Sequence, residues 1–133
     1  MNQVNRPWIT ERLMQSLQLL ACPPEIQLGK VPSFVYAPDE MAQDFDNFRL
    51  AFIDNFRTEM TGEQLHCLEL IDRAFEQMSK NCFSPDQVRN SGEWRKIREL
   101  ASDALSAFGW PLSDPPRRDH EFVSGETRSE SSD

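Results

Sequence analysis

The sequence predicts an all-α fold, a small bundle of four main helices with one additional short helical turn. Two observations lead to this prediction. Apolar residues recur at spacings of three and four along four stretches of the chain. Several of these stretches begin at a residue that can cap a helix or with a proline suited to a first helical turn. No stretch of useful length alternates between apolar and polar residues, so a real sheet is not expected.

The first helix is expected from about Trp8 to Ala21. Its apolar face is formed by Ile9, Leu13, Leu17 and Leu20, with Ser16 on the same side. Pro7 suits the first turn, where the missing N–H is not needed. The helix should end at Cys22, because Pro23 and Pro24 follow.

A proline-rich loop is expected over residues 22–38. Four prolines and Gly29 interrupt any regular pattern there. Residues 33–36 are extended in character but have no evident strand to pair with. We therefore predict a covering loop, with a small two-stranded ribbon and an α+β fold as the alternative.

The second helix should begin after Pro38 and run to about Glu59. Its apolar stripe consists of Met41, Phe45, Phe48, Phe52 and Phe56, with Ile53 beside it. Four phenylalanines on one stripe are typical of the centre of a core. A ligand pocket between the rings is the alternative interpretation.

The third helix should run from the capping box at residues 61–64 to about Ser79. Its core face is formed by Gln64, Cys67, Leu68, Ile71, Ala74, Phe75 and Met78. Because the turn before it is short, the second and third helices should pack as an antiparallel hairpin.

Two further helical segments complete the predicted body, residues 1–112. Ser84 and Pro85 predict a short helical turn. Ser91 caps a last helix from Gly92 to Phe108, which Gly109 and the residues after it should close in a Schellman motif. Residues 113–133 are polar apart from two apolar side chains, so we expect a disordered tail.

The negative charge of the chain is concentrated in one window. The formal net charge is −8, and residues 39–76 hold ten carboxylates against three arginines, which is −7. Like charges held on a folded segment oppose stability, so a function is expected to maintain them. The simplest function is to bind a basic protein. The same charge argues against nucleic acid and anionic membranes as direct partners.

Composition also bears on the class of protein. No apolar run approaches the length of a membrane span, and we expect no secretory signal at the start. The three cysteines have no paired spacing, which favours buried thiols and a cytoplasmic location.

Catalytic and metal motifs are weak in this sequence. Glu63 and His66 have the Glu-x-x-His spacing of di-iron bundles, but the second motif that such sites need is missing. The three cysteines lack a Cys-x-x-Cys pair for zinc. We therefore expect neither an enzyme nor a bound cofactor.

Helical geometry places acidic residues in two rows on the expected hairpin. The row on the second helix contains Glu40, Asp44 and Asp54, and the row on the third helix contains Glu69, Asp72 and Glu76. Each row sets like charges about one helical turn apart, which weakens an isolated helix by about 0.2–0.5 kcal/mol per pair. An ordinary solvated face is one interpretation. The other is a docking surface for a basic protein, with Leu65 and Tyr36 as apolar anchors. The predicted partner-binding residues are Glu40, Asp44, Asp54, Leu65, Glu69, Asp72, Glu76 and Tyr36.

Parts of the helical pattern resemble small acidic immunity proteins of bacterial polymorphic-toxin systems. The resemblance is carried by residues 94–110 (Trp94, Ile97, Arg98, Ala101, Ala104, Leu105, Phe108, Gly109 and Trp110), by Phe48, Arg49, Ala51 and Phe52, and by the start at residues 61–64 with Leu68 and Phe75. The resemblance covers about half of the predicted body. It implies a cytoplasmic protein that binds a cognate toxin domain, often a basic nuclease, and blocks it.

The sequence thus predicts a protein-binding inhibitor of a basic toxin or nuclease domain. Two alternatives stay open. A secretion chaperone would also be small and acidic, although such chaperones usually combine helices with a sheet. A regulatory protein that mimics the charge of DNA would use the same carboxylates against many basic proteins.

Overall fold

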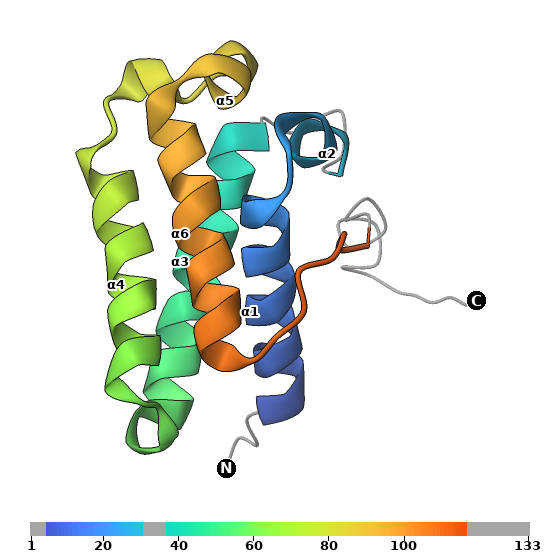
Figure 1. Ribbon diagram of the computed structural model, residues 1–133. Coiled ribbons are helices and arrows are strands. Elements are labelled where there is room, and N and C mark those ends of the chain that lie inside the picture. Colours follow the sequence, from blue (N-terminus) through green and yellow to red (C-terminus); the bar gives the residue numbers. More distant parts are fainter. Residues whose placement is uncertain (1–4, 31–36, 117–133) are drawn as a thin grey trace.

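The computed structural model describes residues 5–30 and 37–116, and within these ranges it contains helices and no strand (Figure 1). The elements are α1 (Arg6–Ala21), α2 (Pro24–Gly29), α3 (Ala37–Phe56), η1 (Arg57–Glu59), α4 (Gly62–Gln77), η2 (Lys80–Cys82), α5 (Pro85–Asn90) and α6 (Gly92–Phe108). The predicted all-α fold with four main helices is confirmed.

The four main helices α1, α3, α4 and α6 run side by side, and the short helices α2 and α5 lie together at one end (Figure 1). Helix α1 packs closely against α3 and α6, and α4 packs closely against α6. Helices α3 and α4 follow each other across a short turn, but their backbones make far fewer close approaches. The expected hairpin is therefore not the tightest pairing in the bundle.

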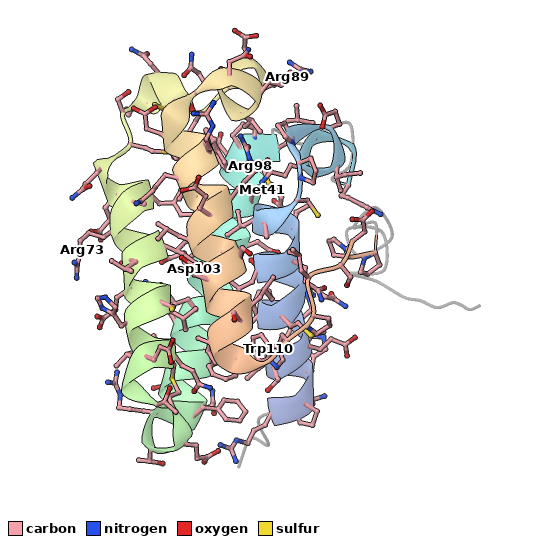
Figure 2. The ribbon with its side chains drawn as sticks, in the orientation of Figure 1. Met41, Arg73, Arg89, Arg98, Asp103 and Trp110 are labelled. Carbon is pink, nitrogen blue, oxygen red and sulfur yellow. The ribbon has the colours of Figure 1, made fainter. Side chains whose placement is uncertain are left out.

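The core contains the apolar faces that the sequence predicts. Leu13, Leu17 and Leu20 of α1 are fully buried, as are Leu68 and Ile71 of α4. The phenylalanine stripe of α3 is buried at Met41, Phe45 and Phe52, whereas Phe48 and Phe56 are half-buried. Figure 2 shows Met41 beside the helices of the core.

Helix ends follow the predicted capping signals. The Thr61 hydroxyl accepts from the Gln64 N–H, and the Gln64 side chain accepts from the Thr61 N–H, each at 3.0 Å. At the other end of the chain, Gly109 has φ of 71°, and the Trp110 N–H donates to the Leu105 carbonyl at 2.9 Å. This is the predicted Schellman close.

Helix α2 was not expected, because four prolines and Gly29 favoured a loop over residues 22–38. Pro24 instead occupies the start of the helix, where proline is tolerated, and Glu25 lies in the first turn. The side chain of Gln27 is fully buried and donates to the Leu20 carbonyl at 2.9 Å. That bond anchors α2 on the end of α1. The two-stranded ribbon was the alternative prediction for the segment that includes residues 33–36. Those four residues lie outside the described residues.

The folded part of the chain extends beyond residue 112, where the sequence placed its boundary. The side-chain amide of Gln18 donates to the Pro111 carbonyl at 3.0 Å and to the Ser113 hydroxyl at 3.2 Å. Pro115 is buried. The contacts of Gln18 join residues 111–113 to α1, and the composition of the segment alone does not reveal them. The rest of the predicted tail lies outside the described residues.

Candidate functional site

The structure places one member of each predicted acidic row in a different seam between helices. Asp44 of α3 is buried, and its carboxylate lies 3.8 Å from the Arg12 guanidinium of α1. Asp72 of α4 lies 3.3 Å from the Arg49 guanidinium of α3. Asp44 and Arg49 therefore lie on opposite flanks of α3. Asp44 and Asp72 thus each face an arginine of a neighbouring helix, which was not expected from the helical spacing.

The other predicted partner-binding residues differ in exposure. Asp54, Glu69 and Glu76 are exposed, and Glu40 is half-buried. Leu65 is half-buried and packs against the core, so it is a poor anchor for a partner. Tyr36 lies outside the described residues.

A groove lies along the seam between α3 and α4, with a volume of about 340 Å³. It is lined by Ala42, Phe45, Asp46, Asp72, Phe75, Glu76 and Phe83. The ring centroids of Phe45 and Phe75 lie 6.1 Å apart, and those of Phe75 and Phe83 lie 6.5 Å apart. The groove thus combines a wall of aromatic rings with three carboxylates. Two of these, Asp72 and Glu76, belong to the acidic row that the sequence predicts on α4.

Aromatic side chains explain why this seam is open. Phe45 and Phe75 stand between α3 and α4, and large rings hold two backbones farther apart than small side chains do. Helices α4 and α6 approach each other more closely, and the ring of Phe75 also lies 5.6 Å from that of Trp94 of α6.

Arg49 is the cation at the edge of this groove. Its Nη2 lies 2.8 Å from Asp46 Oδ1 and 3.3 Å from Asp72 Oδ1, and its side chain is only 13% exposed. Its Nε is buried and has no hydrogen-bond partner among the described residues. Arg49 contacts two of the three carboxylates that line the groove, Asp46 and Asp72, so the lining keeps a negative charge. Asp46 and Phe83 were missed by sequence reasoning, although the spacing from Asp46 to Arg49 suits an i,i+3 ion pair.

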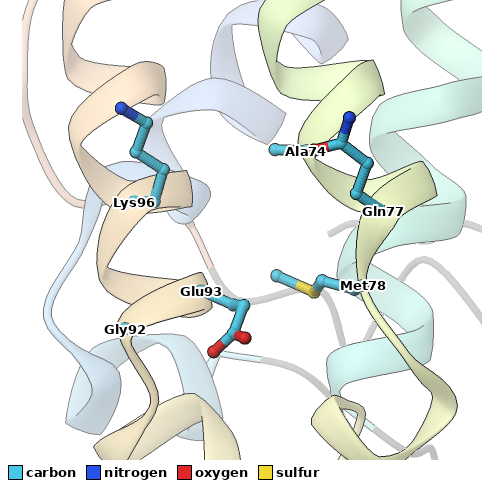
Figure 3. A pocket seen from close by; sticks show the side chains of 6 residues that line it. All are labelled: Ala74, Gln77, Met78, Gly92, Glu93 and Lys96. Carbon is cyan, nitrogen blue, oxygen red and sulfur yellow. The ribbon is translucent and has the colours of Figure 1, made fainter.

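A second hollow, of about 510 Å³, lies between α4 and α6 (Figure 3). Ala74 of α4 and Met78, directly after α4, point into the space between the helices, with Glu93 and Lys96 on α6 across from them (Figure 3). Its lining carries one carboxylate and one ammonium group and no aromatic ring. It therefore has neither the charge bias nor the aromatic wall of the α3–α4 groove.

Two of the cysteines, Cys22 and Cys67, are poorly suited to nucleophilic chemistry. Burial and the neighbouring Asp114 carboxylate raise the pKa of Cys22 to about 11. Burial, together with Glu63 and Asp103, also raises the pKa of Cys67. A raised pKa keeps a thiol protonated and unreactive near neutral pH. His66 is exposed, and no group of His, Cys, Asp and Glu side chains in the described ranges is arranged to hold a metal ion.

Comparisons with protein-family models, with curated proteins and with solved structures found no match to this chain. Within residues 5–30 and 37–116, none of the helices combines the length and apolar character that crossing a membrane requires.

Proposed function

We propose that this chain binds a basic protein at the α3–α4 seam and neutralises it, as an immunity protein neutralises its toxin. The observation that carries the proposal is the groove itself, where Asp46, Asp72 and Glu76 surround the rings of Phe75 and Phe83. An interface needs apolar contact area as well as charge, and this groove offers both at one place.

Charges outside the groove support the same proposal. Glu69 is exposed on α4, and Asp54 is exposed on α3. Exposed carboxylates around a docking site attract a cationic protein over a distance of about 10 Å at 0.1 M salt and raise its association rate. Arg73 of α4, which also points outward from the bundle (Figure 2), offsets part of this negative charge.

Two alternatives use the same features. A secretion chaperone is less favoured, because such chaperones usually combine helices with a sheet and the described residues hold only helices. A protein that mimics the charge of DNA is the stronger competitor, since its carboxylates would bind many basic proteins. A cytoplasmic location is part of our proposal and rests on the three free cysteines.

The test is capture followed by inhibition. The immobilised chain is exposed to a lysate of its source organism at about 0.15 M salt, and retained proteins are identified and purified. We expect one basic protein that elutes at high salt and whose activity the free chain inhibits stoichiometrically. Retention of many basic proteins that DNA displaces equally would favour the DNA-mimic alternative. Retention of no basic protein would contradict both.

A further inference from the structure

Two arginines of this chain sit between an aromatic ring and a carboxylate. The Arg12 guanidinium lies 4.6 Å from the centre of the Phe48 ring and 3.8 Å from Asp44. The Arg6 guanidinium lies 4.1 Å from the centre of the Phe56 ring and 2.7 Å from Glu59. A ring face and a carboxylate together stabilise a guanidinium, because one attracts its flat face and the other its N–H edge.

The α3–α4 groove offers the same two components. Phe75 and Phe83 supply rings, and Asp72 and Glu76 supply carboxylates. None of the cation–ring contacts between described residues involves either of these rings. Arg49 is held by Asp46 and Asp72, while Glu76 forms no ion pair among the described residues. The groove therefore holds two rings, Phe75 and Phe83, together with the exposed carboxylate of Glu76.

We propose that the groove receives a single arginine side chain of the basic partner. The flat guanidinium would stack on Phe75 or Phe83 and donate to Glu76, with its aliphatic stem along the aromatic wall. This inference rests on the proposed function and names the chemical group that the site selects. A volume of about 340 Å³ lies at the small end of the range for ligand pockets, as expected for one inserted side chain.

Other occupants fit the groove less well. An anion would be repelled by the three carboxylates of the lining. An apolar side chain would bury Glu76 without a partner, and burying an unpaired charge is costly. A lysine would gain the charge interaction with Glu76. Its ammonium group is not planar, however, so it cannot stack on a ring and donate two parallel hydrogen bonds to a carboxylate as a guanidinium does.

The test is a peptide titration of the full ¹⁵N-labelled chain, monitored by two-dimensional NMR. The probe is the capped peptide acetyl-Gly-Arg-Gly-amide, and its control carries citrulline, which has the same shape without the charge. We expect millimolar binding of the arginine peptide, with shifts centred on the amides of Ala42, Asp46, Phe75 and Phe83. We expect binding of the citrulline peptide to be at least fivefold weaker, or about 1 kcal/mol. Equal binding of the two peptides, or shifts spread over all exposed carboxylates, would overturn the inference.

Two matched variants sharpen the assignment. Glu76→Gln should weaken binding of the arginine peptide about fivefold, whereas Glu69→Gln, two turns away on the same flank of α4, should change it less than twofold. Phe83→Leu keeps an apolar side chain but removes the ring face, and it should weaken binding as well. Equal effects of Glu76→Gln and Glu69→Gln would show that the peptide responds only to the overall negative charge of the chain.

The outcomes also separate this inference from the proposed function. If the captured basic protein binds the Glu76→Gln variant as tightly as the unchanged chain, the arginine pocket is wrong and the inhibitor proposal stands. If the arginine peptide binds in the groove but no basic protein is captured, the pocket stands and the inhibitor proposal fails.

Discussion

Arg49 of α3 and Asp72 of α4 form an ion pair across the α3–α4 seam, with Nη2 and Oδ1 separated by 3.3 Å. The pair joins two helices whose backbones approach each other at few points. It also removes Asp72 from the set of outward charges that the sequence predicts. Arg49 and Asp72 thus both bridge the seam and bound the groove.

This ion pair should contribute to stability. In a double-mutant cycle with Arg49→Met and Asp72→Asn, we expect a coupling free energy of about 1 kcal/mol, measured by urea unfolding. The Arg6–Glu59 pair, at 44% and 55% side-chain exposure, is the control and should couple more weakly because water screens it. Coupling near zero at Arg49–Asp72 would mean that the seam does not depend on the pair.

Phe52 of the α3 stripe should be sensitive to truncation. It is 5% exposed, and its centroid lies 4.3 Å from that of Phe56 and 5.5 Å from that of Phe108. Phe52→Ala should lower the free energy of unfolding by about 3–5 kcal/mol, because it leaves a cavity. Leu50→Ala on the same helix is the control; Leu50 is 52% exposed, so we expect a change of about 0.5 kcal/mol or less. Similar losses for both variants would contradict the packing.

Arg98 should connect α6 to the two short helices. Its Nη1 lies 3.1 Å from Gln27 Oε1 and 3.0 Å from the Val88 carbonyl, and burial lowers its pKa from the ordinary value. Arg98→Met should cost about 1–3 kcal/mol, since it leaves both acceptors without this donor. Arg95→Met, at an exposed position, should have little effect on thermal unfolding. A loss at Arg98 no larger than that at Arg95 would show that this link is dispensable.

Cys22 should make stability fall at alkaline pH. Its folded-state pKa is about 11 against 9.0 for an ordinary thiol, so the folded chain keeps a proton that the unfolded chain releases. Its contribution to stability is complete below pH 9 and declines as the pH rises toward 11. Cys22→Ser should flatten that decline in unfolding curves recorded between these limits.

The same thiol should resist alkylation. Its Sγ lies 3.7 Å from Asp114 Oδ1, and that carboxylate raises its pKa. Iodoacetamide at pH 8 should therefore modify Cys22 slowly, and Asp114→Ala should accelerate the reaction. Mass spectrometry of the three cysteines measures each rate in one sample. An unchanged rate at Cys22 in the Asp114 variant would mean that burial alone protects the thiol.

The sequence predicted most of the fold because its signals were local. The capping box at Thr61 and the Schellman close at Gly109 depend on residues within one turn of each other, and both are present. Apolar spacing located the buried faces for the same reason. Helix α2 escaped prediction because Pro23 and Pro24 fit a helix start and a loop equally well.

The candidate site could be predicted only in part. Helical spacing put Asp72 and Glu76 on one flank of α4, and both line the groove. It could not show that Asp44 faces Arg12 or that Phe83 completes an aromatic wall, because both depend on which helices become neighbours. Contacts between distant segments follow from packing of the whole chain, and single-helix geometry does not contain that information.

The most direct test of the docking site is a cross-saturation NMR measurement on the labelled chain bound to the captured basic protein. Saturation from the partner should reach amides of α3 and α4 beside the groove, around Ala42, Asp46 and Glu76. Attenuation centred on α1, α6 or residues 111–116, with the α3–α4 seam unaffected, would contradict the account.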